Sequence, residues 1–174
     1  MSLLQRKVAL VRKVEIVKAC YADIVFVARN MRKMDKEEIY PLIYNPSPEN
    51  LAAFTIAVGG ISMCANFMGR PVAVFGAGEV RPRNHSVWMF ATPKWPKVAL
   101  SVTRYIKKIL MPNLIKLGSN RAECFTLKGH NVAQDWLSAL GAIRESTLDD
   151  YGPERKTYYC YSWTRKRLEK EGKF

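Results

Sequence analysis

Residues 85–142 decide the fold of this chain. An apolar run, Ser86-Val-Trp-Met-Phe-Ala-Thr92, is followed by a helical pattern over residues 95–117. A second short run, Arg121-Ala-Glu-Cys-Phe-Thr-Leu-Lys128, precedes His130-Asn-Val-Ala-Gln-Asp-Trp-Leu-Ser-Ala-Leu-Gly-Ala142, which has the pattern of a further helix closed by glycine. Strands that alternate with helices predict a βαβα unit with two parallel neighbouring strands. Ligands of open α/β sheets bind at the carboxyl ends of such strands, beside helix N-termini that favour anions.

The residues before this unit predict a strand, three helices and a hairpin. From the β-branched alternation and the helical spacing, we expect a strand at residues 11–20, helices at 23–31, 35–44 and 47–55, and an antiparallel hairpin at 61–68 and 71–80. Gly76 and Gly78 inside the second hairpin strand indicate a bulge, or a place where a ligand or another backbone comes close. Pro112 is expected to kink or end the long helix, because proline removes a backbone donor.

Charge is the unusual feature of the composition. The chain has 28 Lys plus Arg against 15 Asp plus Glu, a net charge of +13. Such a balance favours anionic partners, although a solvated basic face that keeps the protein soluble would give the same count. The sequence has no nucleic-acid-binding motif, no apolar run of the ~20 residues that span a bilayer and no apolar core for a signal peptide near its start. We therefore expect neither a nucleic-acid nor a membrane partner, and a place in the cytoplasm of a cell.

The four cysteines are far apart in the sequence, at Cys20, Cys64, Cys124 and Cys160. They form no Cys-x-x-Cys motif and no cluster with histidine, so the sequence predicts no metal site. Three of them lie in apolar, strand-like runs, which is typical of buried reduced thiols.

The helix over residues 130–142 carries the most specific motif. His130, Ala133, Trp136-Leu137, Leu140 and Gly141-Ala142 are similar to the pattern Asn/His-x-x-Ala-x-x-aromatic-Tyr/Leu-x-x-Leu-Gly-Phe/Ala of the GNAT acetyltransferase superfamily. In particular, the chain resembles short GNAT-like proteins of tailed bacteriophages, and the order of elements matches over residues 14–163. The resemblance implies one α/β domain at residues 1–163, with a mixed sheet of six or seven strands and helices on both faces. A basic C-terminal tail at residues 164–174 would follow.

The same resemblance implies acetyl-CoA as the cofactor and an amine as the acceptor, with an amine of a host protein as one candidate. The strands at 87–92 and 122–128 would splay apart and admit the acetyl-pantetheine arm between them. The implied cofactor-binding residues are Phe90, Ala91 and Thr92 at the thioester, Lys94 and Lys97 at the phosphates, and Trp136 beside the pantetheine channel.

Transfer to an amine requires a base for the amine proton and benefits from an acid for the departing thiolate. Glu79 lies at the end of the glycine-containing strand. We expect that strand to border the groove, so Glu79 is the preferred candidate for the base, with Glu123 as the alternative. His130 and Cys124 are candidates for the acid. His130 could equally cap its helix or pack in the core.

Two departures from the family pattern support an alternative function. Active members carry glycines in a Gln/Arg-x-x-Gly-x-Gly/Ala loop, which lets the backbone approach phosphate, whereas Thr92-Pro-Lys-Trp-Pro-Lys-Val-Ala99 has none. Leu137 also stands where many members have tyrosine. The alternative is a catalytically degenerate GNAT-like phage protein that acts through protein contacts, for example an internal component of the virion with virion proteins as partners.

Overall fold

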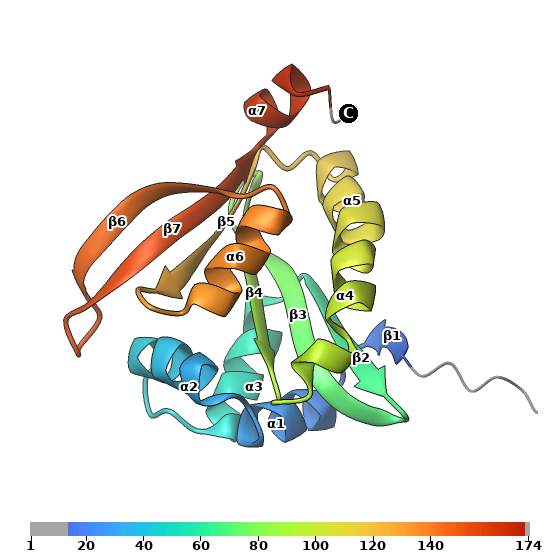
Figure 1. Ribbon diagram of the computed structural model, residues 1–174, viewed down its shortest axis with the longest axis vertical. Helices are drawn as coiled ribbons and strands as arrows, with labels where there is room; N and C mark the ends of the chain where they lie inside the picture. Colours follow the sequence, from blue (N-terminus) through green and yellow to red (C-terminus); the bar gives the residue numbers. More distant parts are fainter. Residues whose placement is uncertain (1–13, 173–174) are drawn as a thin grey trace, which may run out of the picture.

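A seven-stranded sheet with the order β1-β2-β3-β4-β5-β7-β6 runs through the molecule (Figure 1). The computed structural model describes residues 14–172. The strands are β1 (Val14–Lys18), β2 (Ile61–Phe67), β3 (Arg70–Arg81), β4 (Asn84–Ala91), β5 (Arg121–Leu127), β6 (Ile143–Tyr151) and β7 (Lys156–Thr164). Within this sheet β4 and β5 are parallel, and the other neighbours are antiparallel. The prediction of a mixed sheet of six or seven strands is therefore confirmed, and so is the parallel pair.

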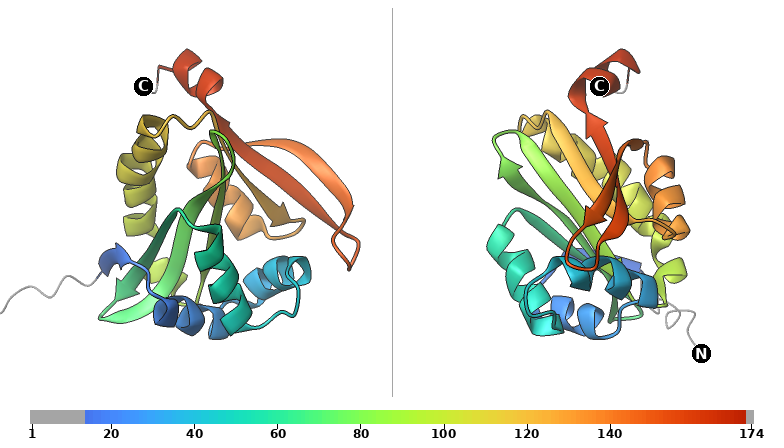
Figure 2. Two further views of the ribbon diagram at one scale, coloured as in Figure 1. Left: turned by 180° about the vertical axis from the view of Figure 1, so that it is seen from behind. Right: turned by 90° about the vertical axis from the view of Figure 1, so that its left-hand side faces the viewer.

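Helices cover both faces of the sheet, as expected (Figure 2). One face carries α1 (Tyr21–Arg29) and α3 (Pro48–Val58), and the other carries α4 (Ala99–Tyr105), the π-helical turn η3 (Ile106–Leu110), α5 (Met111–Lys116) and α6 (Asn131–Ala139). The shorter elements are α2 (Lys33–Ile39), the 3-10 turns η1 (Tyr40–Leu42) and η2 (Trp95–Lys97), and α7 (Arg165–Lys170).

The alternation of β4 separates two hydrophobic cores. Successive side chains of a strand point to opposite faces. Val87 and Met89 accordingly pack with the cluster under α4 and α6, whereas Trp88 and Phe90 pack with the cluster under α1 and α3. A single strand thus contributes apolar side chains to both layers.

The two glycines of β3 lie where other backbone comes close. A Cβ added to Gly76 would lie 2.0 Å from the Ile61 carbonyl oxygen and 2.7 Å from the Trp88 ring, and one added to Gly78 would lie 2.6 Å from Val58. The register between β3 and β4 also shifts after Glu79. The close approach that the sequence indicated is present at both glycines, whereas the register shift lies beyond them.

The long helix expected at residues 95–117 is divided into several segments. The π-helical turn η3 comes directly before α5, whose second residue is Pro112. Proline cannot donate to the carbonyl four residues earlier, at Lys108, and the wider turn accommodates this loss.

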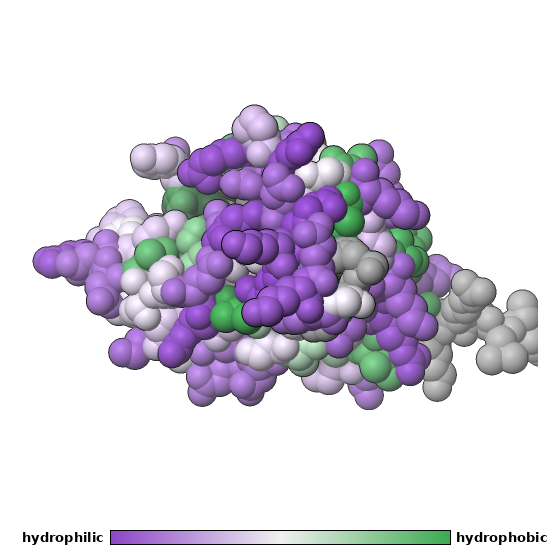
Figure 3. Space-filling model, turned by 90° about the horizontal axis from the view of Figure 1, so that it is seen from above, coloured by the Kyte–Doolittle hydropathy of each residue, from purple (hydrophilic) through white to green (hydrophobic). Residues whose placement is uncertain are grey.

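The ends of the described chain differ in detail from expectation. Of the strand expected at residues 11–20, residues 14–18 form β1, and residues 11–13 lie outside the described part. At the other end, β7 reaches Thr164 and α7 follows it directly. Arg165 anchors α7, because its Nη2 donates to the Ile115 carbonyl at 2.9 Å. The side of the molecule that carries α7 is mainly hydrophilic (Figure 3). Among the described helices, none combines the length and the apolar character that a bilayer span requires.

Candidate functional site

The parallel strands β4 and β5 are joined at one end only. They pair through Asn84↔Arg121, His85↔Ala122 and Ser86↔Glu123. Beyond these positions β4 continues beside β3, and β5 continues beside β7. The sheet therefore divides into two diverging halves, with a gap between residues 87–91 and residues 124–127 (Figure 1). Strand edges that face such a gap present backbone groups that can bind a ligand.

A cavity of about 400 Å³ occupies this gap and borders both hydrophobic cores. On one face of the sheet its lining includes Leu51, Phe54 and Val58 of α3, and on the other Ile106 and Leu110 of η3. The polar side chains in its wall are Glu38, Thr55, Ser86 and Thr126. An apolar cavity with a few polar groups is typical of a small-molecule site.

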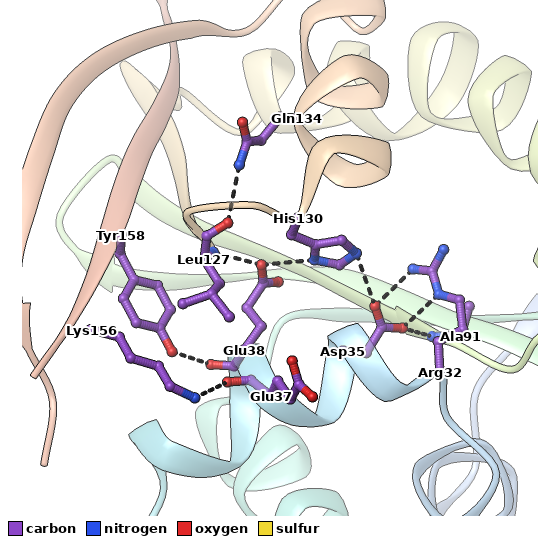
Figure 4. Close-up of polar contacts among 10 residues, drawn as sticks. All are labelled: Arg32, Asp35, Glu37, Glu38, Ala91, Leu127, His130, Gln134, Lys156 and Tyr158. Atoms are coloured by element: carbon purple, nitrogen blue, oxygen red, sulfur yellow. Dashed lines mark hydrogen bonds and ion pairs between the residues drawn. The ribbon is translucent and has the colours of Figure 1, made fainter. Parts of the chain in front are cut away.

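Helix α2 closes the open end of the gap with two buried carboxylates (Figure 4). An Asp35 oxygen accepts the Ala91 N–H at 2.9 Å, at the end of β4. A Glu38 oxygen accepts the Leu127 N–H at 2.7 Å, at the end of β5. Because residues three apart lie on one face of a helix, both carboxylates of α2 reach the sheet. One short helix thereby connects the ends of both splayed strands.

His130 lies between the two carboxylates. Its Nδ1 is 2.9 Å from Glu38 Oε2, and its Nε2 is 3.5 Å from Asp35 Oδ1. The imidazole is only 4% exposed. Arg32 completes the cluster through Nε and Nη2, which donate to the two Asp35 oxygens at 3.0 and 2.9 Å. This is the bidentate geometry that gives strong charge-assisted bonds. His130 is the N-cap residue of α6, but its side chain makes no capping bond.

The backbone of α2 is tied to the other half of the sheet. The Tyr158 hydroxyl on β7 donates to the Glu38 carbonyl at 2.6 Å. Burial, and then the charge of Glu38, raises the pKa of Tyr158 well above its usual value, so the phenol remains a donor. Lys156 Nζ lies 3.5 Å from the Glu37 carbonyl oxygen. These contacts hold the buried face of α2 against β5 and β7.

The predicted cofactor-binding residues are divided between the cavity and the loop after β4. Phe90 and Trp136 line the cavity, whereas Ala91, Thr92, Lys94 and Lys97 do not. Several amides of the loop are bonded within it. The N–H of Trp95 donates to the Thr92 carbonyl at 3.0 Å, and that of Lys97 donates to the Lys94 carbonyl at 2.9 Å. This loop therefore offers its lysine charges more readily than its amides.

Two tryptophans pack beside this loop. The Trp95 and Trp136 rings meet edge to face with centroids 5.2 Å apart, and the Arg32 guanidinium lies 5.8 Å above the Trp95 ring. Trp136 Nε1 donates to Thr103 Oγ1 at 2.9 Å. Trp136 thus joins α6 to α4 while one side of it borders the cavity.

The strand of Glu79 borders the cavity through Phe75, Gly76 and Val80, as expected, but Glu79 itself does not line it. Glu79 pairs with His85 at the joined end of β4. Its carboxylate accepts the Arg83 N–H in the turn between β3 and β4. The alternative base, Glu123, is bonded to Arg121. Cys124, a candidate for the acid, lines the cavity, but burial raises the pKa of its thiol, which makes it a poor proton donor to a departing thiolate.

The structure brings together residues that the sequence did not single out. Arg32, Asp35 and Glu38 are spaced by three, so they share a helix face, and that spacing is their only sequence signal. Of the two predicted catalytic residues, His130 belongs to this cluster and Glu79 does not. The four cysteines are free, and within residues 14–172 no group of three His, Cys, Asp or Glu side chains is arranged so that it could hold a metal ion.

No protein-family model matches the chain, and no curated protein matches it in sequence. Three solved structures that match in fold show the extent of the likeness. Ard1 from Thermoplasma volcanium matches with a TM-score of 0.68 and 11% identity, over 87% of this chain and 97% of that one. An acetyltransferase of the GNAT family from Bacillus anthracis matches with a TM-score of 0.66 and 13% identity, over 88% and 96%. The protein yncA from Salmonella typhimurium, with its cofactor acetyl-CoA, matches with a TM-score of 0.64 and 13% identity, over 87% and 94%.

At these identities the likeness concerns the fold, while function depends on the site. It extends over most of both chains. The chain has the fold of the GNAT acetyltransferases.

Proposed function

We propose that this protein transfers an acyl group from a coenzyme A thioester to an amine. The observation that carries the proposal is the cavity in the gap between β4 and β5, with a buried carboxylate and imidazole at its end. A protein of the same fold holds acetyl-CoA. The cofactor would supply the acyl group in activated form, as a thioester.

The residues around the gap fit the thioester end of such a cofactor. The cavity is mostly apolar, and the Thr126 hydroxyl in its wall has no hydrogen-bond partner among the described residues. A buried polar group without a partner calls for an explanation, and an amide or carbonyl of a ligand would provide one. Lys94 and Lys97 are exposed on the loop after β4, where their charges can attract phosphates.

Glu38 is the residue placed to act as the base. It lines the cavity, and its carboxylate is held by Leu127 and His130. A positioned carboxylate can accept the proton that the amine must lose. His130 and Asp35 are positioning residues, since His130 Nδ1 lies 2.9 Å from that carboxylate and Asp35 lies 3.5 Å from the other ring nitrogen of His130. Because α2 already occupies the amides of Ala91 and Leu127, a ligand that takes either amide must displace its carboxylate.

Calorimetric titration with acetyl-CoA and with coenzyme A tests this proposal. Moderate salt is needed, because a protein of charge +13 attracts any polyanion at low ionic strength. We expect saturable binding that persists in salt, and turnover with an amine acceptor that Glu38→Gln reduces. Absence of saturable binding would overturn the proposal.

A second function is favoured by the way the strand-end amides are occupied. Asp35 and Glu38 bond to them, and the loop after β4 lacks glycine and bonds to itself. We propose as the alternative a degenerate protein that keeps the scaffold and acts through protein contacts, such as an internal virion component. The phage origin, and a host protein as the acceptor in the enzymatic case, belong to these proposals. Failure to bind either cofactor form would favour the alternative.

A further inference from the structure

We propose that the acyl group taken by this site is an aliphatic chain longer than acetyl. The inference rests on the proposed transferase function and names its class of acyl donor. It is carried by the polarity of the cavity wall and by the path of the cavity through the sheet.

Two of the four polar side chains in the wall lie together at one end of the gap. Glu38 and Thr126 lie near the carboxyl end of β5, where the thioester would be placed. Thr55 has its hydroxyl satisfied, because Oγ1 donates to the Leu51 carbonyl at 2.7 Å. Ser86 belongs to the last paired position of β4, at the joined end. Between these two ends the wall is apolar, with Phe75, Trp88, Met89, Ile106, Leu110 and Phe125 among its residues. A ligand with a polar thioester at one end and an aliphatic chain at the other matches such a wall.

The cavity continues from one hydrophobic core to the other. Ile106 and Leu110, at the two ends of the π-helical turn, line it on the α4 side, and π-helical turns are frequent at functional sites. On the α3 side it reaches Phe54 and Val80, which are 58% and 48% exposed. A two-carbon acyl group would leave most of this apolar space unfilled. A longer chain would fill it and bury methylenes from water.

The acceptor amine is a poorer occupant of the apolar part. A charged amine needs a carboxylate or other acceptors nearby. Among residues 14–172, the carboxylate that lines the wall is that of Glu38, at the strand ends. In the transfer step, the nitrogen of the neutral amine bonds to the carbonyl carbon and the carbon–sulfur bond breaks. The proton of the amine passes to Glu38, and the sulfur departs as a thiolate. No further reactant is required.

The test compares the affinities of acetyl-, butyryl- and octanoyl-CoA by calorimetry in one buffer. The three thioesters carry the same phosphates, so the basic protein attracts them equally. The ratio of their affinities therefore reports the contribution of the acyl chain alone. Burial of one methylene strengthens binding about fourfold. We therefore expect the affinity to rise about tenfold or more for every two methylenes added to the acyl chain, until the cavity is full.

A variant with a larger side chain in the cavity wall tests whether the acyl chain lies in the cavity. Ser86→Phe adds a large side chain at a residue of the cavity wall, and Ser146→Phe makes the same change at an exposed residue of β6 outside it. We expect the octanoyl-to-acetyl ratio to collapse in the first variant and to persist in the second. Ser86→Leu serves in place of Ser86→Phe if thermal denaturation shows that the larger residue prevents folding.

The outcomes separate this inference from the proposed function. If acetyl-CoA binds and octanoyl-CoA binds no more tightly, the preference for a long acyl chain is refuted, while the transferase proposal stands. An octanoyl-to-acetyl affinity ratio that persists equally in the Ser86 and Ser146 variants would also overturn the inference, because the acyl chain would then lie outside the cavity. If none of the three thioesters binds, the proposed function fails and the inference fails with it.

Discussion

Replacing Glu38 by glutamine should weaken the attachment of α2 to the splayed strands. The carboxylate accepts the Leu127 N–H at 2.7 Å and lies 2.9 Å from His130 Nδ1. Its side chain is 12% exposed, so water screens these contacts little. Glu38→Gln keeps the shape and one acceptor oxygen but removes the charge.

The magnitude follows from the two contacts. A hydrogen bond to a charged group contributes about 1.5–3 kcal/mol and a neutral one about 1 kcal/mol. Losing the charge therefore costs about 1 kcal/mol for each contact, or about 2 kcal/mol of unfolding free energy in total. For a chain of 174 residues this lowers the melting temperature by about 4–8 °C. Thermal denaturation followed by circular dichroism measures the change.

Glu37→Gln is the matched control, because it makes the same substitution one residue away. The Glu37 side chain is 41% exposed, and its carboxylate lies 3.6 Å from the exposed Lys33 ammonium. Such a surface pair contributes less than about 1 kcal/mol. If Glu38 is also the base, Glu38→Gln lowers kcat by about 10²–10⁴-fold while Glu37→Gln leaves it unchanged. Equal melting temperatures for the two variants would refute the structural reasoning, and unchanged turnover in Glu38→Gln would refute the catalytic role.

Three further predictions concern the cavity, the loop and the thiols. Thr126→Val removes a buried hydroxyl without a partner among the described residues, so it should raise the melting temperature of the free protein by about 2–4 °C while weakening thioester binding; a lower melting temperature would contradict this. Lys94→Glu combined with Lys97→Glu should weaken coenzyme A binding about tenfold at moderate salt, and unchanged affinity in calorimetry would place the phosphates elsewhere. Cys20 is exposed, whereas burial raises the pKa of Cys64 to about 12, so mass spectrometry after brief iodoacetamide treatment at pH 8 should find Cys20 modified first.

The fold could be predicted from the sequence because its signals are local. The alternation of strand and helix in residues 85–142, the cap at Ser47 and the glycines of β3 each act within a few residues. Ser47 accepts the Asn50 N–H at 3.0 Å, as its place before Pro48 indicates. Such patterns identify elements and their order.

The candidate site could not be predicted in the same way, because its partners are distant in sequence. Asp35 bonds to a residue 56 positions away, and Glu38 bonds to one 89 positions away. Lys33, Lys36 and Glu37 surround these residues with charges, so the segment resembles an ordinary solvated helix. The acidic face of α2 is buried only because β4 and β5 diverge. The N–H groups at the ends of these strands then have no partner on the neighbouring strand and bind the carboxylates instead.

The direction of β3 explains why the Glu79 carboxylate lies away from the open end of the gap. β3 is antiparallel to β4, so the carboxyl end of β3 lies beside the amino end of β4. The gap opens toward the carboxyl end of β4. A carboxylate that ends β3 therefore lies at the joined end, where Glu79 binds the Arg83 N–H.

The most direct test of the central claim follows backbone amide resonances of the labelled protein by NMR during titration with acetyl-CoA. Our account predicts saturable shifts at residues 87–91 and 124–127, the facing edges of the gap, together with changes at the amides of Ala91 and Leu127 that α2 now binds. Shifts confined to exposed lysines, or no saturable shifts at all, would contradict the claim that the gap between β4 and β5 is an acyl-CoA site.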